Sequence, residues 1–207
     1  MVRTSLAALA VLALAACSDS PTDTARQITR DEAENLAPVW EELSGAVLDG
    51  FGGPSLSLAP VEGAAAGTTT TTFTRTHTCP VSGNITVQGT ATFVYDPATR
   101  DGSHTFAATR TDNACTINVR NGSGTISVTG NPNVALTSQQ TWAAGVPGVR
   151  TATQKGGFTW SRSTGASGTC AVDLTSTWTP QTRTHTVKGT FCGHEVDVTH
   201  TPHDRKP

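Results

Sequence analysis

Apolar and polar residues alternate with a period of two over most of the chain between residues 68 and 200. Val172, Leu174 and Trp178, for example, are separated by aspartate, serine and threonine residues. Such alternation is typical of strands with one buried face and one wet face. It predicts about ten strands, at 69–79, 84–95, 103–111, 115–120, 123–129, 133–142, 149–162, 169–179, 182–191 and 194–200.

The connections between these strands are short, so consecutive strands are expected to pair as an antiparallel meander. The clearest hairpin turns at Asn121-Gly122, a dipeptide that favours a type I′ turn, and it sets Ile117 opposite Ile126. Ten twisted strands tend to curl or to split into two sheets. We therefore expect an all-β domain at 68–200, as a barrel, a half-barrel or a sandwich.

One segment before the strands, residues 29–49, has helical periodicity instead. Thr29 and Glu32 have the spacing of a capping box. Apolar residues recur at helical spacing and form one face: Leu36, Val39, Trp40, Leu43 and Val47. This amphipathic helix is expected to pack on the sheet, although such a face would also suit a binding partner. Residues 50–67 are rich in Gly, Pro and Ala and indicate a linker, and residues 201–207 indicate a flexible tail.

The N-terminus has the pattern of an export signal. Arg3 is followed by an apolar run from Ser5 to Ala16, and small residues precede Cys17. The tetrapeptide Leu14-Ala15-Ala16-Cys17 resembles the lipobox of bacterial lipoproteins. A run of twelve apolar residues is too short for a transmembrane helix, which needs about 20. An ordinary secreted protein with a cysteine at the cleavage site is the alternative.

The resemblance implies cleavage before Cys17 and a lipid on its sulfur. Residues 1–16 are then a signal peptide, and residues 17–28 comprise the lipidated cysteine and a polar tether. The implied partner is a membrane, and the implied location is the cell envelope. By similarity to enterobacterial sorting, Ser18 favours the outer membrane where the source has two.

Composition limits the function further. Charged residues make up 14% of the chain and the net charge is −2, so no basic surface is available for nucleic acid. The 38 threonines and 20 glycines agree with an all-β domain. No nucleophile elbow, HExxH motif, Walker loop or Rossmann glycine pattern occurs, so we predict no enzyme and no cofactor.

Four cysteines remain after Cys17. An even number in an exported domain indicates disulfides, and spacing alone leaves three pairings open. A meander brings all four to one end of the sheet. This arrangement favours Cys79–Cys115 and Cys170–Cys192, each of which joins nearby strands.

Positively charged side chains are predicted on the inner face. The segment Thr-Arg-Thr-His-Thr occurs at 74–78 and at 182–186, and its Arg and His share parity with apolar neighbours. Parity thus places Arg75, His77, Arg183 and His185 inward.

A neighbouring strand adds further inward residues. His104 and Arg110 share parity with Phe106, and the predicted register sets Arg75 and Arg110 on opposite sides of Gly89. Two guanidinium groups over a glycine gap could hold a carboxylate or phosphate. The alternative is that these side chains reach water at the strand ends.

No metal site is predicted. His194 and His200 share a strand face, but their separation of roughly 20 Å is too large for one ion.

These observations favour a cell-envelope lipoprotein of unknown biochemical activity that acts by binding or scaffolding. Its partner would be an envelope protein. A carrier or sensor for a small anionic or amphipathic ligand inside a curved sheet is the first alternative. An enzyme without a recognisable motif is the second.

Overall fold

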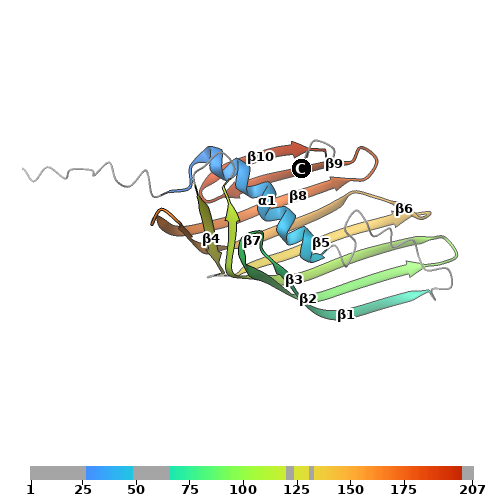
Figure 1. The fold of residues 1–207 in the computed structure, drawn as a ribbon. Coiled ribbons are helices and arrows are strands. Elements are labelled where there is room, and N and C mark those ends of the chain that lie inside the picture. The colour runs from blue at the N-terminus through green and yellow to red at the C-terminus, as the bar shows by residue number, and fades with distance from the viewer. Residues whose placement is uncertain (1–26, 49–65, 120–123, 131–132, 202–207) are drawn as a thin grey trace, which may run out of the picture.

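The computed structural model describes residues 27–48, 66–119, 124–130 and 133–201. One helix, α1 (Arg30–Leu48), precedes all the strands (Figure 1). The strands are β1 (Gly67–Thr78), β2 (Ser82–Asp96), β3 (Asp101–Asn118), β4 (Thr125–Thr129), β5 (Val134–Ala143), β6 (Val146–Pro147), β7 (Arg150–Arg162), β8 (Ser167–Thr179), β9 (Thr184–Phe191) and β10 (His194–His200).

All ten strands belong to one antiparallel sheet. Most strands that are consecutive in the chain pair as the predicted meander requires, but β4 does not pair with β5 and β6 does not pair with β7. Two of them, β4 and β5, share the same place in the order. Both lie between β3 and β7, with β4 along one half of these long strands and β5 along the other. The pairings β3–β4–β7–β5 therefore form a closed circuit within the sheet.

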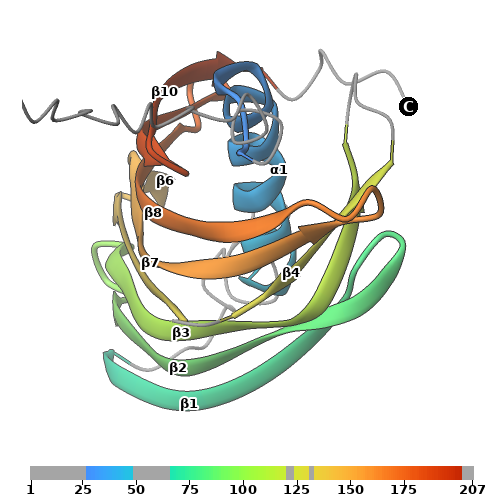
Figure 2. The same ribbon diagram turned by 90° about the vertical axis from the view of Figure 1, so that its left-hand side faces the viewer.

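The sheet curls, and α1 lies against its concave face (Figure 2). The helix contacts β1 and β2 on one side and β9 and β10 on the other. Trp40 is the centre of this contact: its ring stacks on Phe158 at a centroid distance of 4.4 Å and meets Phe191 edge-on at 5.9 Å. The core of the molecule thus lies between one helix and one curled sheet.

Alternation along the strands explains which residues reach this core. On β8, for example, Cys170, Val172, Leu174 and Ser176 are buried, whereas Thr169, Ala171, Asp173 and Thr175 are exposed. Glycines occur where strands come close together. A Cβ on Gly156, at a φ of 149°, would lie 2.3 Å from the Asn133 carbonyl oxygen.

The predicted all-β fold with a preceding amphipathic helix is confirmed, and α1 begins and ends within one residue of its expected bounds. One strand prediction is wrong. The expected strands 103–111 and 115–120 are a single strand, β3, which keeps its pairing with β2 through Asp112 and Asn113. Both polar residues find partners there: Asp112 binds Arg110, and the Asn113 Nδ2 atom donates to Asn84 Oδ1 over 2.8 Å.

Several predictions fall outside the described residues: the signal peptide, Cys17, nearly all of the tether and the linker, the Asn121-Gly122 turn and most of the tail. The register beside that turn is nevertheless described, and Ile117 lies opposite Ile126 as expected. Among the described residues, no helix has the length and apolar character needed to cross a membrane.

Candidate functional site

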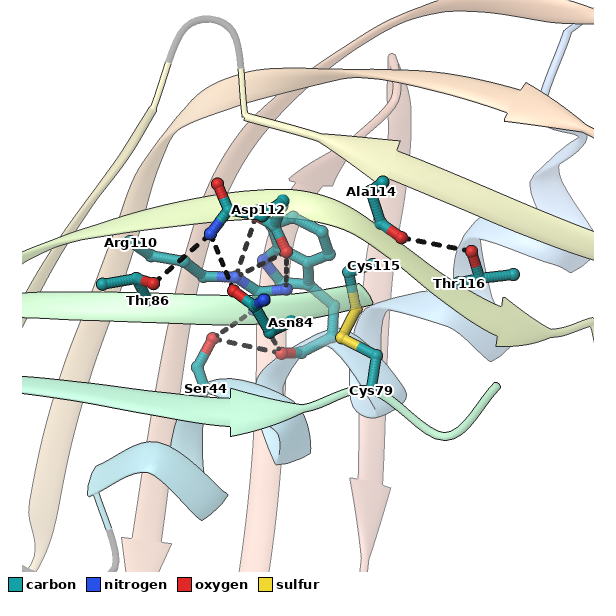
Figure 3. Close-up of a disulfide and its surroundings, with 11 residues drawn as sticks. Ser44, Cys79, Asn84, Thr86, Arg110, Asp112, Ala114, Cys115 and Thr116 are labelled. Carbon is teal, nitrogen blue, oxygen red and sulfur yellow. Dashed lines mark hydrogen bonds and ion pairs between the residues drawn. A yellow bond between two sulfur atoms is a disulfide. The ribbon is translucent and has the colours of Figure 1, made fainter. Parts of the chain in front are cut away.

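The most unusual feature of the concave face is a fully buried arginine. Arg110 lies on β3, and its guanidinium group covers the Trp40 ring at 3.5 Å from the centroid. Its Nη2 donates to Asp112 Oδ1 over 2.7 Å, and its Nε lies 3.1 Å from Asp112 Oδ2. Its Nη1 donates to the Trp40 carbonyl oxygen over 2.9 Å and to Ser44 Oγ over 2.6 Å. Figure 3 shows Arg110, Asp112 and Ser44 near the disulfide between Cys79 and Cys115.

Every nitrogen of this guanidinium group therefore already has an oxygen acceptor within the protein. Burial lowers the pKa of Arg110, and the Asp112 carboxylate offsets part of that shift. The arginine joins the sheet to α1, and its side chain is fully buried. Its chemistry is that of a structural clamp.

A second polar contact joins α1 to β8 and β9. The buried Glu41 lies 3.3 Å from His185 Nε2 and accepts a hydrogen bond from Ser176 Oγ over 3.1 Å. Burial raises the pKa of Glu41, but the hydrogen bond and charge of His185, the charge of Arg150 and the Ser176 hydroxyl together lower it below its ordinary value. The carboxylate is therefore held ionised inside the fold.

A small cavity lies beside these two contacts. The volume open to the centre of a water molecule is about 20 Å³, which is enough for one water molecule but too little for an organic ligand. Its lining comes from α1, β3, β5 and β7 and includes Glu41, Ser44, Ser138, Arg150 and Gln154. Ser138 is 6% exposed, and its Oγ has no hydrogen-bond partner among the described residues.

His104 lies on β3, the strand that also carries Arg110. Its ring stacks on Phe93 at a centroid distance of 4.4 Å, and its Nε2 has no hydrogen-bond partner among the described residues. Burial, with a further contribution from the charge of Arg150, lowers the pKa of His104 to about 4. The imidazole is neutral at physiological pH and acts there as an aromatic core residue.

The expected pair of arginines over a glycine gap is not formed. The register places Val87, rather than Gly89, between Arg75 and Arg110. Gly89 lies instead between Phe73 and Ala108, and a Cβ there would be 2.6 Å from the Ala108 side chain. The prediction failed because it inferred the β1–β2 and β2–β3 registers without seeing the turns, and an error of two residues in register preserves parity.

The other residues predicted to face inward have different outcomes. His185 faces the core, and His77 is half-buried with the inward parity expected of it. Arg75 has that parity too, but it is exposed because β1 is at the edge of the sheet. Arg183 is wrong as a strand residue: it lies before β9, in a turn, with a φ of 52°.

Both preferred disulfides are formed, Cys79–Cys115 and Cys170–Cys192. The cysteines meet at one end of the sheet, as the meander predicts. The described residues contain no group of three or more His, Cys, Asp or Glu side chains that could hold a metal ion. His194 instead has its Nε2 2.8 Å from the Ile28 carbonyl oxygen, next to the start of α1.

The partners of Arg110 were not predicted from sequence. Asp112 follows Arg110 by two residues and therefore shares its strand face, which is a usable signal for a pair. The helix residues Ser44, which binds Arg110, and Glu41, which lies beside His185, carried no comparable signal, because polar residues within an amphipathic helix ordinarily face water.

Comparison of the chain with protein-family models, with curated proteins and with solved structures gives no match.

Proposed function

We propose that the chain is a cell-envelope lipoprotein, held to a membrane by a lipid on Cys17, whose curled sheet acts by binding or scaffolding and catalyses no reaction. Where the source has two membranes, the outer one is its location. The support for the anchor is the lipobox-like tetrapeptide Leu14-Ala15-Ala16-Cys17. The two disulfides agree with an oxidising compartment outside the cytoplasm.

A single observation favours binding or scaffolding over carriage of a small molecule. The concave face, where a carrier would hold its ligand, is occupied by α1. Trp40 fills the space between Phe158, Phe191 and the Arg110 guanidinium group. The cavity that the structure describes beside Glu41 and Ser44 has room for about one water molecule. The surface left for recognition is the convex face and the edges of the sheet.

Metabolic labelling tests the anchor. Cells that express the full chain are supplied with an alkyne-tagged palmitate, and the envelope is then separated from soluble protein. We expect the wild-type chain to carry the label and to sediment with membranes, whereas the Cys17→Ser variant carries no label. A Ser18→Ala variant is the matched control, because it changes the neighbouring residue and leaves the sulfur in place.

An unlabelled wild-type chain, or equal labelling of the Cys17→Ser variant, would contradict the proposed anchor. Binding is tested separately by chemical cross-linking in intact envelopes. A purified chain that turns over a substrate would contradict the second half of the proposal.

A further inference from the structure

The two edges of the sheet differ in how they are protected. β10 has seven residues, and its exposed side includes Glu195 and Asp197, whose charges discourage the addition of another strand. β1 has twelve residues and, among the described residues, pairs only with β2. Its first six residues, from Gly67 to Thr72, are exposed on both faces. The strand as a whole is also in contact with α1.

β1 also lacks the usual features that prevent strand addition. It contains no proline, and its pairing with β2 runs through all twelve residues without a bulge. The first charged side chain is Arg75, near its far end. A long, regular edge strand whose first eight residues carry no charge is a template for main-chain pairing with another strand.

We propose that β1 pairs antiparallel with β1 of a second copy of this chain, so that two curled sheets join into one. The dimer does not depend on the proposed function. If Cys17 is lipidated, however, confinement of both copies to one membrane raises their effective concentration and favours the pairing.

The sequence of β1 complements itself. Every second residue of the strand, on the convex side, is a threonine: Thr68, Thr70, Thr72, Thr74, Thr76 and Thr78. A two-fold axis that keeps the convex faces of both copies on the same side pairs even-numbered residues with even-numbered residues. Any such register places threonine opposite threonine on the convex side of the overlap.

The same threonine pairs already join strands within one copy. Oγ1 atoms lie 3.1 Å apart in Thr70–Thr92, 2.7 Å in Thr137–Thr153 and 3.0 Å in Thr186–Thr199. The proposed contact therefore continues across the edge a pattern that the sheet uses inside it.

Charge does not oppose the contact either. With the two-fold axis at Thr71, Arg75 of one copy lies opposite Gly67 of the other. The two arginines are then separated by the length of the paired segment. Arginine would face arginine only if the axis passed through Arg75 itself.

Site-directed cross-linking in intact envelopes tests the proposal. The native cysteines of the folded domain are in disulfides, so Thr70→Cys or Thr72→Cys introduces a free thiol on β1. A short thiol-to-thiol cross-linker should give a product of twice the chain mass, at least fivefold more than from two controls. The controls are Thr175→Cys, in the middle of the convex face on β8, and Asp197→Cys, on the other edge.

Two tags distinguish the partner. When differently tagged copies are co-expressed, the product should carry both tags, and mass spectrometry should find the β1 peptide joined to itself. The pair Thr70→Lys with Thr72→Lys should reduce the dimer seen for wild type in native mass spectrometry by at least fivefold. The pair Thr175→Lys with Thr177→Lys on the same face should leave it unchanged.

Several outcomes would overturn the proposal: a monomeric wild-type chain, equal products from β1 and the controls, or β1 joined to a different protein. The two native disulfides, checked by mass, show that each variant has folded. Palmitate labelling of the same cells reports the anchor independently, so that failure of the dimer and failure of the proposed function can be told apart.

Discussion

At the scale of single residues, the concave face is held by charge compensation as much as by apolar packing. The Arg110 side chain has an exposed fraction of 0%, and its charge is balanced by Asp112 at 2.7 Å. Removing one member of such a pair leaves the other buried and uncompensated, which costs more than the pair itself contributes.

We therefore expect Arg110→Ala to lower the free energy of unfolding by about 3–5 kcal/mol. Urea unfolding with the disulfides intact measures it. Lys155→Ala is the matched control, because Lys155 and Asp173 are 2.9 Å apart but 74% and 57% exposed, and it should cost less than about 1 kcal/mol. The double variant Arg110→Met with Asp112→Leu should recover most of the loss. Equal costs for the two single variants would contradict this account.

His104 predicts a dependence of stability on pH. Its pKa is about 4 in the folded chain and about 6.5 when unfolded, so below pH 6.5 the unfolded chain binds the extra proton first. The contribution of neutral His104 to stability should be complete above pH 6.5 and should be lost as the pH falls toward 4. His104→Phe should flatten the stability curve between these two values.

Glu41 acts in a different window. Since the pKa of Glu41 lies below its ordinary value of 4.5, its contribution to stability is present above pH 4.5 and is lost at still lower pH.

Two results would contradict the buried neutral imidazole of His104. One is a wild-type stability that does not change between pH 6.5 and 4.5, and the other is an NMR titration of His104 near 6.5.

Parity along the strands correctly predicted that Arg110 and His185 face inward. It could not predict their partners, because Ser44, Glu41 and the Trp40 carbonyl come from α1, more than sixty residues away in the chain. The register across two strands was equally hidden, and this misplaced Arg75 relative to Gly89.

At the scale of elements, α1 is fixed at both ends. Near its start, the Thr29 backbone N–H donates to Glu32 Oε2 over 2.9 Å, and the same carboxylate oxygen accepts from Arg162 Nη2 of β7 over 2.7 Å. Toward its other end, Glu41 and Ser44 meet the sheet. The capping box, visible in the sequence, thus has a tertiary partner that the sequence does not indicate.

Thr29→Ala should lower the free energy of unfolding by about 1 kcal/mol, because it removes the Oγ1 that accepts from the Glu32 N–H at 3.3 Å. Arg30→Ala is the control: its pair with Glu34 is exposed and should contribute less than about 0.5 kcal/mol. Thermal or urea unfolding followed by tryptophan fluorescence measures both. A larger effect from Arg30→Ala would contradict the role of the cap.

The strands were largely predictable because alternation, turn residues and short links all agreed. The exception, β3, continues through Asp112 and Asn113 because each finds a partner within the fold, and no local pattern reports such partners. Elements are thus predictable where local chemistry decides them and not where a distant side chain does.

At the scale of the whole molecule, α1 lies in the concave side of the curled sheet, where a carrier would hold its ligand (Figure 2). Native mass spectrometry of residues 18–207, produced in an oxidising compartment, should give the mass of one or two chains with no small molecule bound, each chain less four hydrogens for two disulfides. A reduced and denatured sample is the control. Additional mass beyond that of one or two chains, lost on denaturation, would indicate a bound small molecule and favour the carrier alternative.

The position of α1 has a mechanical consequence. If Cys17 carries a lipid, as we propose, a pull on the anchor reaches the described part of the chain at the start of α1, where Ile28 meets His194 and Glu32 meets Arg162. Further along the helix, the Arg110 contact lies on the path of that load, and beyond it two disulfides close the segments 79–115 and 170–192 against extension. Tension on the anchor would therefore load the contacts of α1 before those of the sheet.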